Sequence, residues 1–395
     1  MKILIIHNFY KSSAPSGEDI VFRREYEMLK ENGASVLTYT RHNDEMTGLR
    51  TILSGVAGIW SWKTYNDVKR IIRTEKPDVA HFHNIWYLIS PSAYYACKEE
   101  GVPIVQTLHN YRMFCSNGLL LREGKVCEEC LRKSEFKSIK YGCYRNSRVL
   151  TFPVALAEQL HRKIGTWDSR VDLYIAVSEF QKKKFTEYGI DCNKIVVKPN
   201  FILDLSIIPE RDAGYVLYVG RISEEKGVLL ILKAAKLLKG SGIKIKLIGD
   251  GPLRERMSRE IVNSDLTEIE LLGRKKHEEV IKYIQKSKFL IVPSIWYETF
   301  GLVAVEAYAC GKAVVASKIG ALEELVQDGK TGLLFEPGNP YDLAKKIEWL
   351  NKNDSASRQM GINARKVYEE KYTKEKNFEI LKSIYKTLIE KASKG

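Results

Sequence analysis

The chain has 395 residues, of which 44% are hydrophobic and 28% are charged. This composition excludes a disordered chain, and the length favours two domains of ordinary size. No run approaches the roughly 18 to 20 apolar residues that cross a bilayer. The opening MKILIIHN is too short an apolar run for a signal peptide, so we expect a cytoplasmic protein.

The formal net charge of +14 would complement three kinds of partner: nucleic acid, an anionic membrane surface or an anionic small substrate. We find no zinc finger, RNA-recognition signature or long basic tail, which argues against nucleic acid. Many basic residues are spread along segments of helical pattern, such as residues 63–76, where the simplest interpretation is a solvated helix face.

In the first half of the chain, short runs rich in isoleucine and valine alternate with segments of helical periodicity. The predicted strands are Lys2–Asn8, Ala34–Arg41, Asp78–Asn84, Pro103–Asn110, Asp172–Ser178 and Ile195–Asn200. The predicted helices between them include Asp19–Glu31, Tyr65–Thr74 and Ser178–Tyr188. Strands that are hydrophobic along their whole length are typical of a parallel sheet covered on both faces.

The second half repeats this pattern. Its predicted strands are Tyr215–Arg221, Ile243–Gly249, Ile269–Gly273, Phe289–Pro293, Ala313–Ser317 and Gly332–Phe335, with helices such as Gly227–Leu238 and Glu278–Gln285. The alternation predicts an α/β fold with two doubly wound parallel sheets, joined near Pro199–Asp212. We expect a first domain over residues 1–205, a second over residues 206–372, and a final helix over residues 373–395 that packs back on the first domain.

Polar residues follow many of these strands, at the ends where ligands bind in such sheets. They are Asn8, His83, His109, Ser178, Asn200, Arg221, Asp250 and Arg274. Strand ends are generally exposed to solvent, which accounts for polar residues there. Solvent exposure alone accounts less well for the presence of two histidines and two arginines. We therefore expect these side chains to converge on one cleft.

The segment that begins at Pro293 ends a strand and starts a helix near Gly301. The first N–H groups of a helix lack intrahelical acceptors and bind anions, so we expect a phosphate site here. Its backbone donors would come from Phe300, Gly301, Leu302 and Val303. Glu298 and Glu306 flank this site, and because carboxylates repel phosphates we expect both to bind hydroxyl groups. The alternative is an amphipathic helix with two surface acids.

These motifs resemble those of the family-4 retaining glycosyltransferases. The E-x7-E pair with Thr-Phe-Gly-Leu inside it resembles the family's donor motif, and residues 220–227 resemble its G-R-x4-K-G segment. Residues 249–252 resemble its G-x-G-P turn and residues 15–18 its glycine-rich first loop, in which Ser16 replaces a usual glycine. The segments 78–84 and 107–110 also fit, so the resemblance covers nearly the whole chain. It implies the GT-B fold, in which two Rossmann-like domains face a central cleft.

The resemblance also implies roles for individual residues. Arg221 and Lys226 would hold the diphosphate of a nucleotide-sugar donor, Glu306 would bind the ribose, and Glu298 the donor sugar. His109 would lie near the transferred sugar. Further expected donor contacts are Gly17, Asn200 and Arg274, the last near the base, and the acceptor side includes His83 and Asn84. His83 has a second interpretation as a purely structural residue.

No Asp-x-Asp metal motif stands at a strand end, so we expect Arg221, Lys226 and the helix start to supply the positive charge in place of Mg²⁺. A retaining enzyme of this kind needs no base, because the leaving phosphate takes the acceptor's proton. The resemblance implies transfer from a nucleotide-diphosphate sugar such as a UDP-sugar to a glycan or lipid-linked acceptor in surface-polysaccharide assembly. The alternatives are a nucleotide-sugar epimerase or phosphorylase of the same fold, and a binding protein that has lost catalysis.

An insert over residues 111–148 carries four of the seven cysteines, Cys115, Cys127, Cys130 and Cys143. A C-x2-C knuckle with two more cysteines suits a tetrahedral structural Zn²⁺, although the simpler interpretation is free thiols in a loop. The insert has few apolar residues, so such an ion would be its main folding determinant. We expect the other cysteines, Cys97, Cys192 and Cys310, to be buried small residues.

The insert is also basic and aromatic, which suits contact with anionic lipid head groups or with a lipid-diphosphate acceptor. Its basic residues are Arg132, Lys133, Lys137, Lys140, Arg145 and Arg148, and its aromatic residues include Phe136, Tyr141 and Tyr144.

Overall fold

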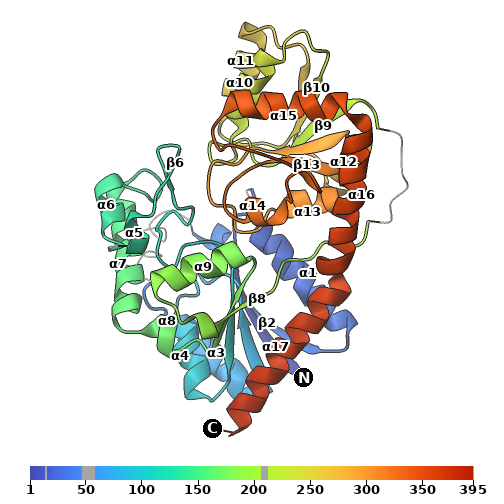
Figure 1. The fold of residues 1–395 in the computed structure, drawn as a ribbon. Helices are drawn as coiled ribbons and strands as arrows, with labels where there is room; N and C mark the ends of the chain where they lie inside the picture. The colour runs from blue at the N-terminus through green and yellow to red at the C-terminus, as the bar shows by residue number, and fades with distance from the viewer. Residues whose placement is uncertain (14–15, 47–57, 133, 206–211, 395) are drawn as a thin grey trace. The chain divides into compact units, whose positions relative to one another are not determined.

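The structure is a computed structural model that describes residues 1–13, 16–46, 58–132, 134–205 and 212–394. Pro15 of the first loop, Lys133 of the insert and residues 206–211 of the expected domain boundary lie outside the described residues. The chain forms two compact units (Figure 1). Unit 1 comprises Met1–Leu120, Cys127–Pro199 and Asn377–Gly395, and unit 2 comprises Leu121–Val126 and Asn200–Lys376.

Unit 1 contains a six-stranded parallel sheet in the order β2-β1-β3-β4-β7-β8. Its strands are β1 Lys2–Phe9, β2 Ser35–His42, β3 Val79–Phe82, β4 Ile104–Leu108, β7 Leu173–Ala176 and β8 Ile195–Val197. Strands β3 and β4 are buried at every residue, as expected for apolar strands covered on both faces. The edge strand β2 is largely half-exposed. All strands are parallel, so the loops that follow them share one edge of the sheet.

The helices of unit 1 are α1 Gly17–Glu31, α3 Trp62–Glu75, α4 Ser92–Glu99, α5 Glu129–Arg132, α6 Lys137–Tyr141, α7 Arg148–Lys163, α8 Thr166–Ser169 and α9 Glu179–Tyr188. Short 3₁₀ turns lie at Asn43–Glu45 and Cys192–Lys194. Most of the last helix, α17 Lys374–Lys394, belongs to unit 1, where the Tyr385 hydroxyl meets Nδ1 of His81 on β3 at 2.6 Å. A two-stranded hairpin, β5 Leu121–Arg122 and β6 Lys125–Val126, is grouped with unit 2.

Unit 2 contains a second six-stranded parallel sheet, in the order β11-β10-β9-β12-β13-β14. Its strands are β9 Tyr215–Val219, β10 Lys244–Ile248, β11 Ile269–Gly273, β12 Phe289–Val292, β13 Ala313–Ser317 and β14 Gly332–Phe335. Its helices are α10 Val228–Leu237, α11 Arg254–Asn263, α12 His277–Lys286, α13 Leu302–Ala309, α14 Ala321–Leu325, α15 Pro340–Lys352 and α16 Asp354–Lys371. The core lies between the sheet and its helices, with Ile231, Leu247 and Ile347 among its fully buried residues.

The predicted fold class is confirmed, since both sheets are parallel and interleaved with helices. All twelve predicted strands form, with small shifts at their ends. Among the described residues, no helix is both long and apolar enough to cross a bilayer.

Candidate functional site

Two neighbouring loops of unit 2 carry the strongest predicted donor residues. β9 and β12 pair side by side, and the loops that follow them are joined by a backbone hydrogen bond from Ile295 N–H to Glu225 O at 3.0 Å. Gly227 has a φ of 67°, and a Cβ atom at this position would lie 1.8 Å from the carbonyl oxygen of Pro293. Only glycine therefore permits the loops to approach this closely.

This approach places Lys226 against Glu298. The Lys226 Nζ donates to Glu298 Oε1 at 2.6 Å, and Ser294 Oγ donates to the same oxygen at 2.7 Å. The ammonium also lies 5.2 Å from the centre of the Trp296 ring. Glu298 is only 7% exposed, and its backbone oxygen accepts from Ala321 N–H at 3.0 Å, so its position is fixed from two sides. The structure thus brings together two predicted site residues that are 72 positions apart in sequence.

The helix that follows Glu298 begins as the sequence predicts. Gly301 precedes α13 with a φ of 98°, a left-handed conformation that suits glycine. The first backbone bond into the helix runs from Ala304 N–H to Gly301 O at 3.0 Å, so the amides of Leu302 and Val303 precede the hydrogen-bonded ladder. Their partial positive charge makes this end a suitable place for an anion. The neighbouring Phe300 is buried against the ring of Tyr372.

Glu306 lies in the second turn of α13 and is 9% exposed. Its Oε1 is 3.8 Å from Nε2 of His277, the first residue of α12. The sequence interpretation missed His277. Its position at a helix start three residues after Arg274, which follows β11, is the signal that was available.

Arg221 lies in the loop after β9 and its side chain is exposed. The Tyr218 hydroxyl donates to the Arg221 carbonyl at 2.7 Å, and Ile222 N–H donates to Asp250 O at 2.9 Å. The second bond joins this loop to the G-x-G-P turn. Arg274 directly follows β11 and is also exposed. Exposed cations at one edge of a sheet can hold an anionic ligand.

Two other predicted donor residues lie elsewhere. Gly17 is the first residue of α1 in unit 1 and follows the N-cap Ser16. The Ser16 side chain accepts from the backbone of Glu18, and the carboxylate of Asp19 accepts from the Ser16 amide at 3.1 Å, so serine caps the helix where the family usually has glycine. Asn200 is buried in unit 2, and its Oδ1 has no hydrogen-bond partner among the described residues.

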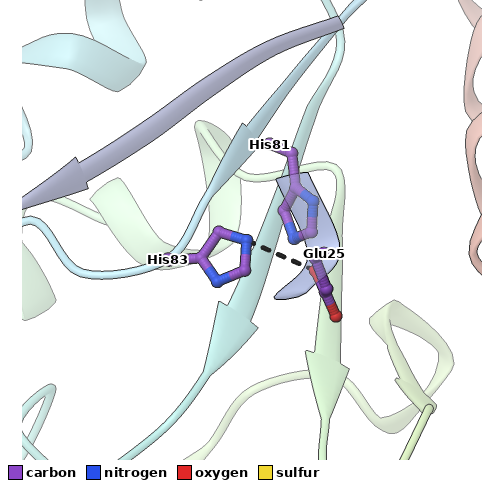
Figure 2. Close-up of side chains that lie close together, drawn as sticks. All are labelled: Glu25, His81 and His83. Atoms are coloured by element: carbon purple, nitrogen blue, oxygen red, sulfur yellow. Dashed lines mark ion pairs between the residues drawn. The ribbon is translucent and has the colours of Figure 1, made fainter. Parts of the chain in front are cut away.

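In unit 1 the two predicted histidines are in contact. His83 Nδ1 lies 3.0 Å from His109 Nε2, and the rings stack with centroids 5.2 Å apart. On its other side, His83 Nε2 lies 3.4 Å from Oε2 of Glu25 on α1 (Figure 2). Burial holds the pKa of His109 well below its ordinary value, so His109 is neutral near pH 7.

Glu25 was not identified from the sequence, although a signal existed. It lies on the buried face of α1, in helical spacing with Phe22, Met28 and Leu29, where an acid is unusual. Lys198 contacts it from the end of β8, and both side chains are fully buried. Burial raises the pKa of Glu25, but the charge of Lys198 and the contact with His83 outweigh burial and hold that pKa well below its usual range.

The other predicted acceptor-side residue, Asn84, is 4% exposed. Its Nδ2 donates to Asn8 O at 2.8 Å, and its Oδ1 accepts from Trp86 N–H at 3.0 Å, so this side chain ties the end of β1 to the loop after β3. His83 and Asn84 line a cavity with His109, Gln106 and Met113.

A second acid near His109 was also missed. Glu18 accepts from Asn110 Nδ2 at 2.6 Å and from the Tyr10 hydroxyl at 3.3 Å. Burial raises the pKa of Glu18, while the Asn110 hydrogen bond and the charge of Arg112 oppose this rise. The signal in the sequence was its place directly after Gly17 in the first loop.

The insert is held by more apolar packing than the sequence led us to expect, and the zinc ion expected there stays a prediction. The ring of Phe114 is fully buried, stacks on Tyr188 at 4.5 Å and meets Phe185 edge-on at 5.1 Å, both residues of α9. Cys115 and Cys130 are buried, and Cys127 and Cys143 are half-buried. The structure describes one group of side chains whose metal-ligand atoms all lie within 4.8 Å of one another, and it consists of Glu25, His81 and His83. Among the described residues, the four cysteine sulfurs do not lie this close together.

Of the remaining cysteines, Cys97 and Cys310 are buried as expected, but Cys192 is exposed. That expectation was wrong because Cys192 begins a 3₁₀ turn on the surface between α9 and β8.

Comparisons with known proteins identify the family. Residues 21–203 match the model "Glycosyltransferase Family 4", and residues 207–367 match "Glycosyl transferases group 1". An uncharacterized glycosyltransferase of Methanocaldococcus jannaschii is 32% identical over 82% of this chain and 87% of its own length. The capsular polysaccharide biosynthesis glycosyltransferase CapM of Staphylococcus aureus is 29% identical over 61% of this chain and 63% of its own.

A crystal structure of Anabaena HepE in complex with UDP has a similar fold, with a TM-score of 0.66 and 18% identity over 97% of this chain and 99% of that one. The likeness extends over both parallel-sheet units described above. The chain therefore belongs to the family-4 glycosyltransferases and has the GT-B fold.

Proposed function

We propose that this glycosyltransferase moves a sugar from a nucleotide diphosphate, with UDP as the first candidate, to a glycan or lipid-linked acceptor, with retention of configuration and without a catalytic metal. The observation that carries the proposal is the contact of Lys226 with Glu298 directly before the start of α13. The loops after β9 and β12 thus bring together a cation, a fixed carboxylate and the start of a helix.

The diphosphate would bind where positive charge gathers. Lys226 is partly exposed, Arg221 is exposed, and the first amides of α13 add the partial charge of a helix start. These groups would stabilise the charge that grows on the leaving phosphate, which is the task a metal ion performs in other enzymes. The UDP complex of HepE supports the choice of nucleotide.

The two carboxylates would divide the hydroxyl groups between them. Glu298, anchored by Lys226 and Ser294, would accept hydrogen bonds from the donor sugar. Glu306, one turn into α13, would accept them from the ribose. Arg274 and His277 lie on the loop after β11 and at the start of α12, where the base would lie on this assignment.

For the acceptor we propose a component of surface-polysaccharide assembly. The likeness to CapM supports this assignment. His109 would contact the transferred sugar, as the family resemblance implies. With the leaving phosphate accepting the proton of the attacking hydroxyl, no side chain has to act as the base.

An exposed patch on α6 and α7 suits contact with an anionic lipid surface. Its large apolar residues are unusually exposed: Phe136 by 44%, Val149 by 81% and Phe152 by 53%. The same segment of the chain also carries the exposed cations Arg132, Lys137, Lys140, Arg145 and Arg148. A segment that exposes both apolar side chains and cations can bind at a lipid interface through burial and charge.

Vesicle co-sedimentation tests this contact. Lys137→Ala with Lys140→Ala should weaken binding to phosphatidylserine vesicles about 30-fold, since each basic residue near an anionic surface contributes about 1 kcal/mol. Lys233→Ala with Lys236→Ala removes two exposed lysines of α10 and is the matched control, with unchanged binding expected. Equal binding of both variants would remove the patch from the proposal.

The proposed donor is tested by thermal unfolding with UDP, GDP, ADP and their sugars. A ligand at one hundred times its Kd stabilises the folded protein by about 2.7 kcal/mol, so a true donor should raise Tm by several degrees. The Arg221→Ala variant should lose most of that shift. If no nucleotide shifts the wild-type protein, the donor assignment is wrong.

A further inference from the structure

A buried chain of polar side chains leads from β8 to His109 within unit 1. Lys198 Nζ donates to Oε1 of Glu25 and, at 3.2 Å, to Oδ1 of Asn377 on α17. Oε2 of Glu25 lies 3.4 Å from His83 Nε2, and His83 Nδ1 lies 3.0 Å from His109 Nε2. Five segments of the polypeptide thus meet: α1, α17, the end of β8 and the loops after β3 and β4.

The charges of Lys198 and Glu25, at the end of this series of side chains away from His109, balance each other. Lys198 and Glu25 are both 0% exposed and form an ion pair, and the low pKa of Glu25 keeps the carboxylate ionised. A neutral His83 leaves the buried group with no net charge, which burial favours.

The ionised carboxylate decides which nitrogen of His83 carries the proton. Glu25 Oε2 and His83 Nε2 are buried, and neither makes a hydrogen bond to any other described residue. If Nε2 of His83 carried no proton, its lone pair would face the Glu25 carboxylate, and two buried acceptors would lie against each other. If Nε2 carries the proton, it donates a hydrogen bond to the carboxylate and both atoms are satisfied. With the proton on Nε2, Nδ1 of His83 is an acceptor, so the 3.0 Å contact requires His109 to donate from Nε2.

We propose that Glu25 and His83 are positioning residues that hold His109 in its Nε2–H tautomer, so that Nδ1 of His109 is a hydrogen-bond acceptor for a sugar hydroxyl. The link to a sugar rests on the proposed function, but the tautomer does not. Neutral His109, kept so by burial, suits an acceptor of a hydroxyl hydrogen.

A metal ion is the competing occupant, because ligand atoms of Glu25, His81 and His83 lie within 4.8 Å of one another (Figure 2). The donor set does not favour it. Both ring nitrogens of His81 are engaged, Nδ1 with the Tyr385 hydroxyl at 2.6 Å and Nε2 with Thr107 Oγ1 at 2.7 Å. The ammonium of Lys198 already neutralises Glu25, and a cation would have to displace it.

The wild-type protein provides the first test. Long-range ¹H–¹⁵N correlation spectra of protein labelled at its histidines report which ring nitrogen carries the proton, and His83→Gln and His109→Gln variants assign the signals. We expect Nε2–H for both His83 and His109 at pH 7.5. A proton on Nδ1 of His109, or a shift of the His81 and His83 signals on adding Zn²⁺, would overturn the proposal. Neither result depends on transfer activity, so failure here is distinct from failure of the proposed function.

A variant then links the tautomer to catalysis. Glu25→Gln with Lys198→Met removes both charges together, and the amide introduced in place of the carboxylate can donate to His83 Nε2 and reverse both tautomers. We expect an Nδ1–H signal at His109 and a fall in kcat of about tenfold, with nucleotide affinity unchanged, as loss of one hydrogen bond made in the transition state predicts. Tyr385→Phe is the control, because it removes a hydrogen-bond partner of His81, which is not part of the series from Lys198 to His109. We expect unchanged tautomers and an unchanged kcat in this variant. Wild-type kcat in the double variant with reversed tautomers would refute the link to sugar binding.

Discussion

Replacing Glu298 with Gln separates sugar binding from nucleotide binding. The amide has the shape of the carboxylate but not its charge, and Glu298 is 7% exposed with Oε1 held by Lys226 at 2.6 Å and Ser294 at 2.7 Å. A hydrogen bond from a hydroxyl to a carboxylate contributes about 1.5–3 kcal/mol, and each 1.4 kcal/mol is a factor of ten. We therefore expect the Kd of the nucleotide sugar to rise about 10- to 100-fold.

The nucleoside diphosphate should respond differently to the same change. Glu298 neutralises Lys226 and would repel a diphosphate bound there, so its replacement should leave the Kd of the diphosphate unchanged or slightly lower. Lys226 is 29% exposed, so solvent screening limits this second effect to roughly 1 kcal/mol.

Isothermal titration calorimetry with the nucleoside diphosphate and with the nucleotide sugar measures both effects. Glu306→Gln is the comparison and should weaken both ligands equally, because both contain the ribose. Ser294→Ala is the milder control: it removes one hydrogen bond to Oε1 and keeps the charge, so about a threefold loss for the sugar donor is expected. Equal losses for both ligands in Glu298→Gln would refute the division of roles.

The remaining predictions concern charge and metals. Arg221→Ala and Lys226→Ala should each lower turnover by about 10²-fold or more while the protein stays folded, as loss of a preorganised charge does, and steady-state rates with the true donor check this. Transfer should continue in EDTA over a short assay, whereas a rapid loss that Mg²⁺ restores would contradict the role given to Arg221, Lys226 and the helix start. Cys127→Ser with Cys130→Ser should keep nucleotide affinity, which calorimetry measures, and because Phe114 packs the insert onto α9 the variant should still fold.

The fold could be predicted from the sequence because each strand is recognisable from the hydrophobic pattern of its own segment. Runs such as Ile3–Ile6 and Ala313–Ala316 are buried along their whole length, so apolar continuity alone identifies them as inner strands of a parallel sheet. The start of α13 was predictable for the same reason, since Gly301 and the preceding strand are local features.

Contacts between distant segments were not predictable in this way. Lys226 and Glu298 meet only because β9 and β12 are neighbours in the sheet and Gly227 lets their loops touch. The contacts that link Lys198 to His109 depend on how three strands and one helix are placed against one another. From the sequence, His83 was therefore recognisable only as a residue at the end of a strand. Glu25 was detectable in principle as an acid on an apolar helix face, but its partner 173 positions away was not.

The most direct test of the central claim follows the anomeric centre. The wild-type protein is mixed with the donor that the thermal screen selects and a lipid-linked glycan acceptor, and ¹H NMR records the anomeric configuration of the product. We predict a new glycosidic linkage with the configuration of the donor, formed only when acceptor is present. A product of inverted configuration would contradict retention, and conversion of the donor in the absence of acceptor would show an enzyme that acts on the nucleotide sugar alone.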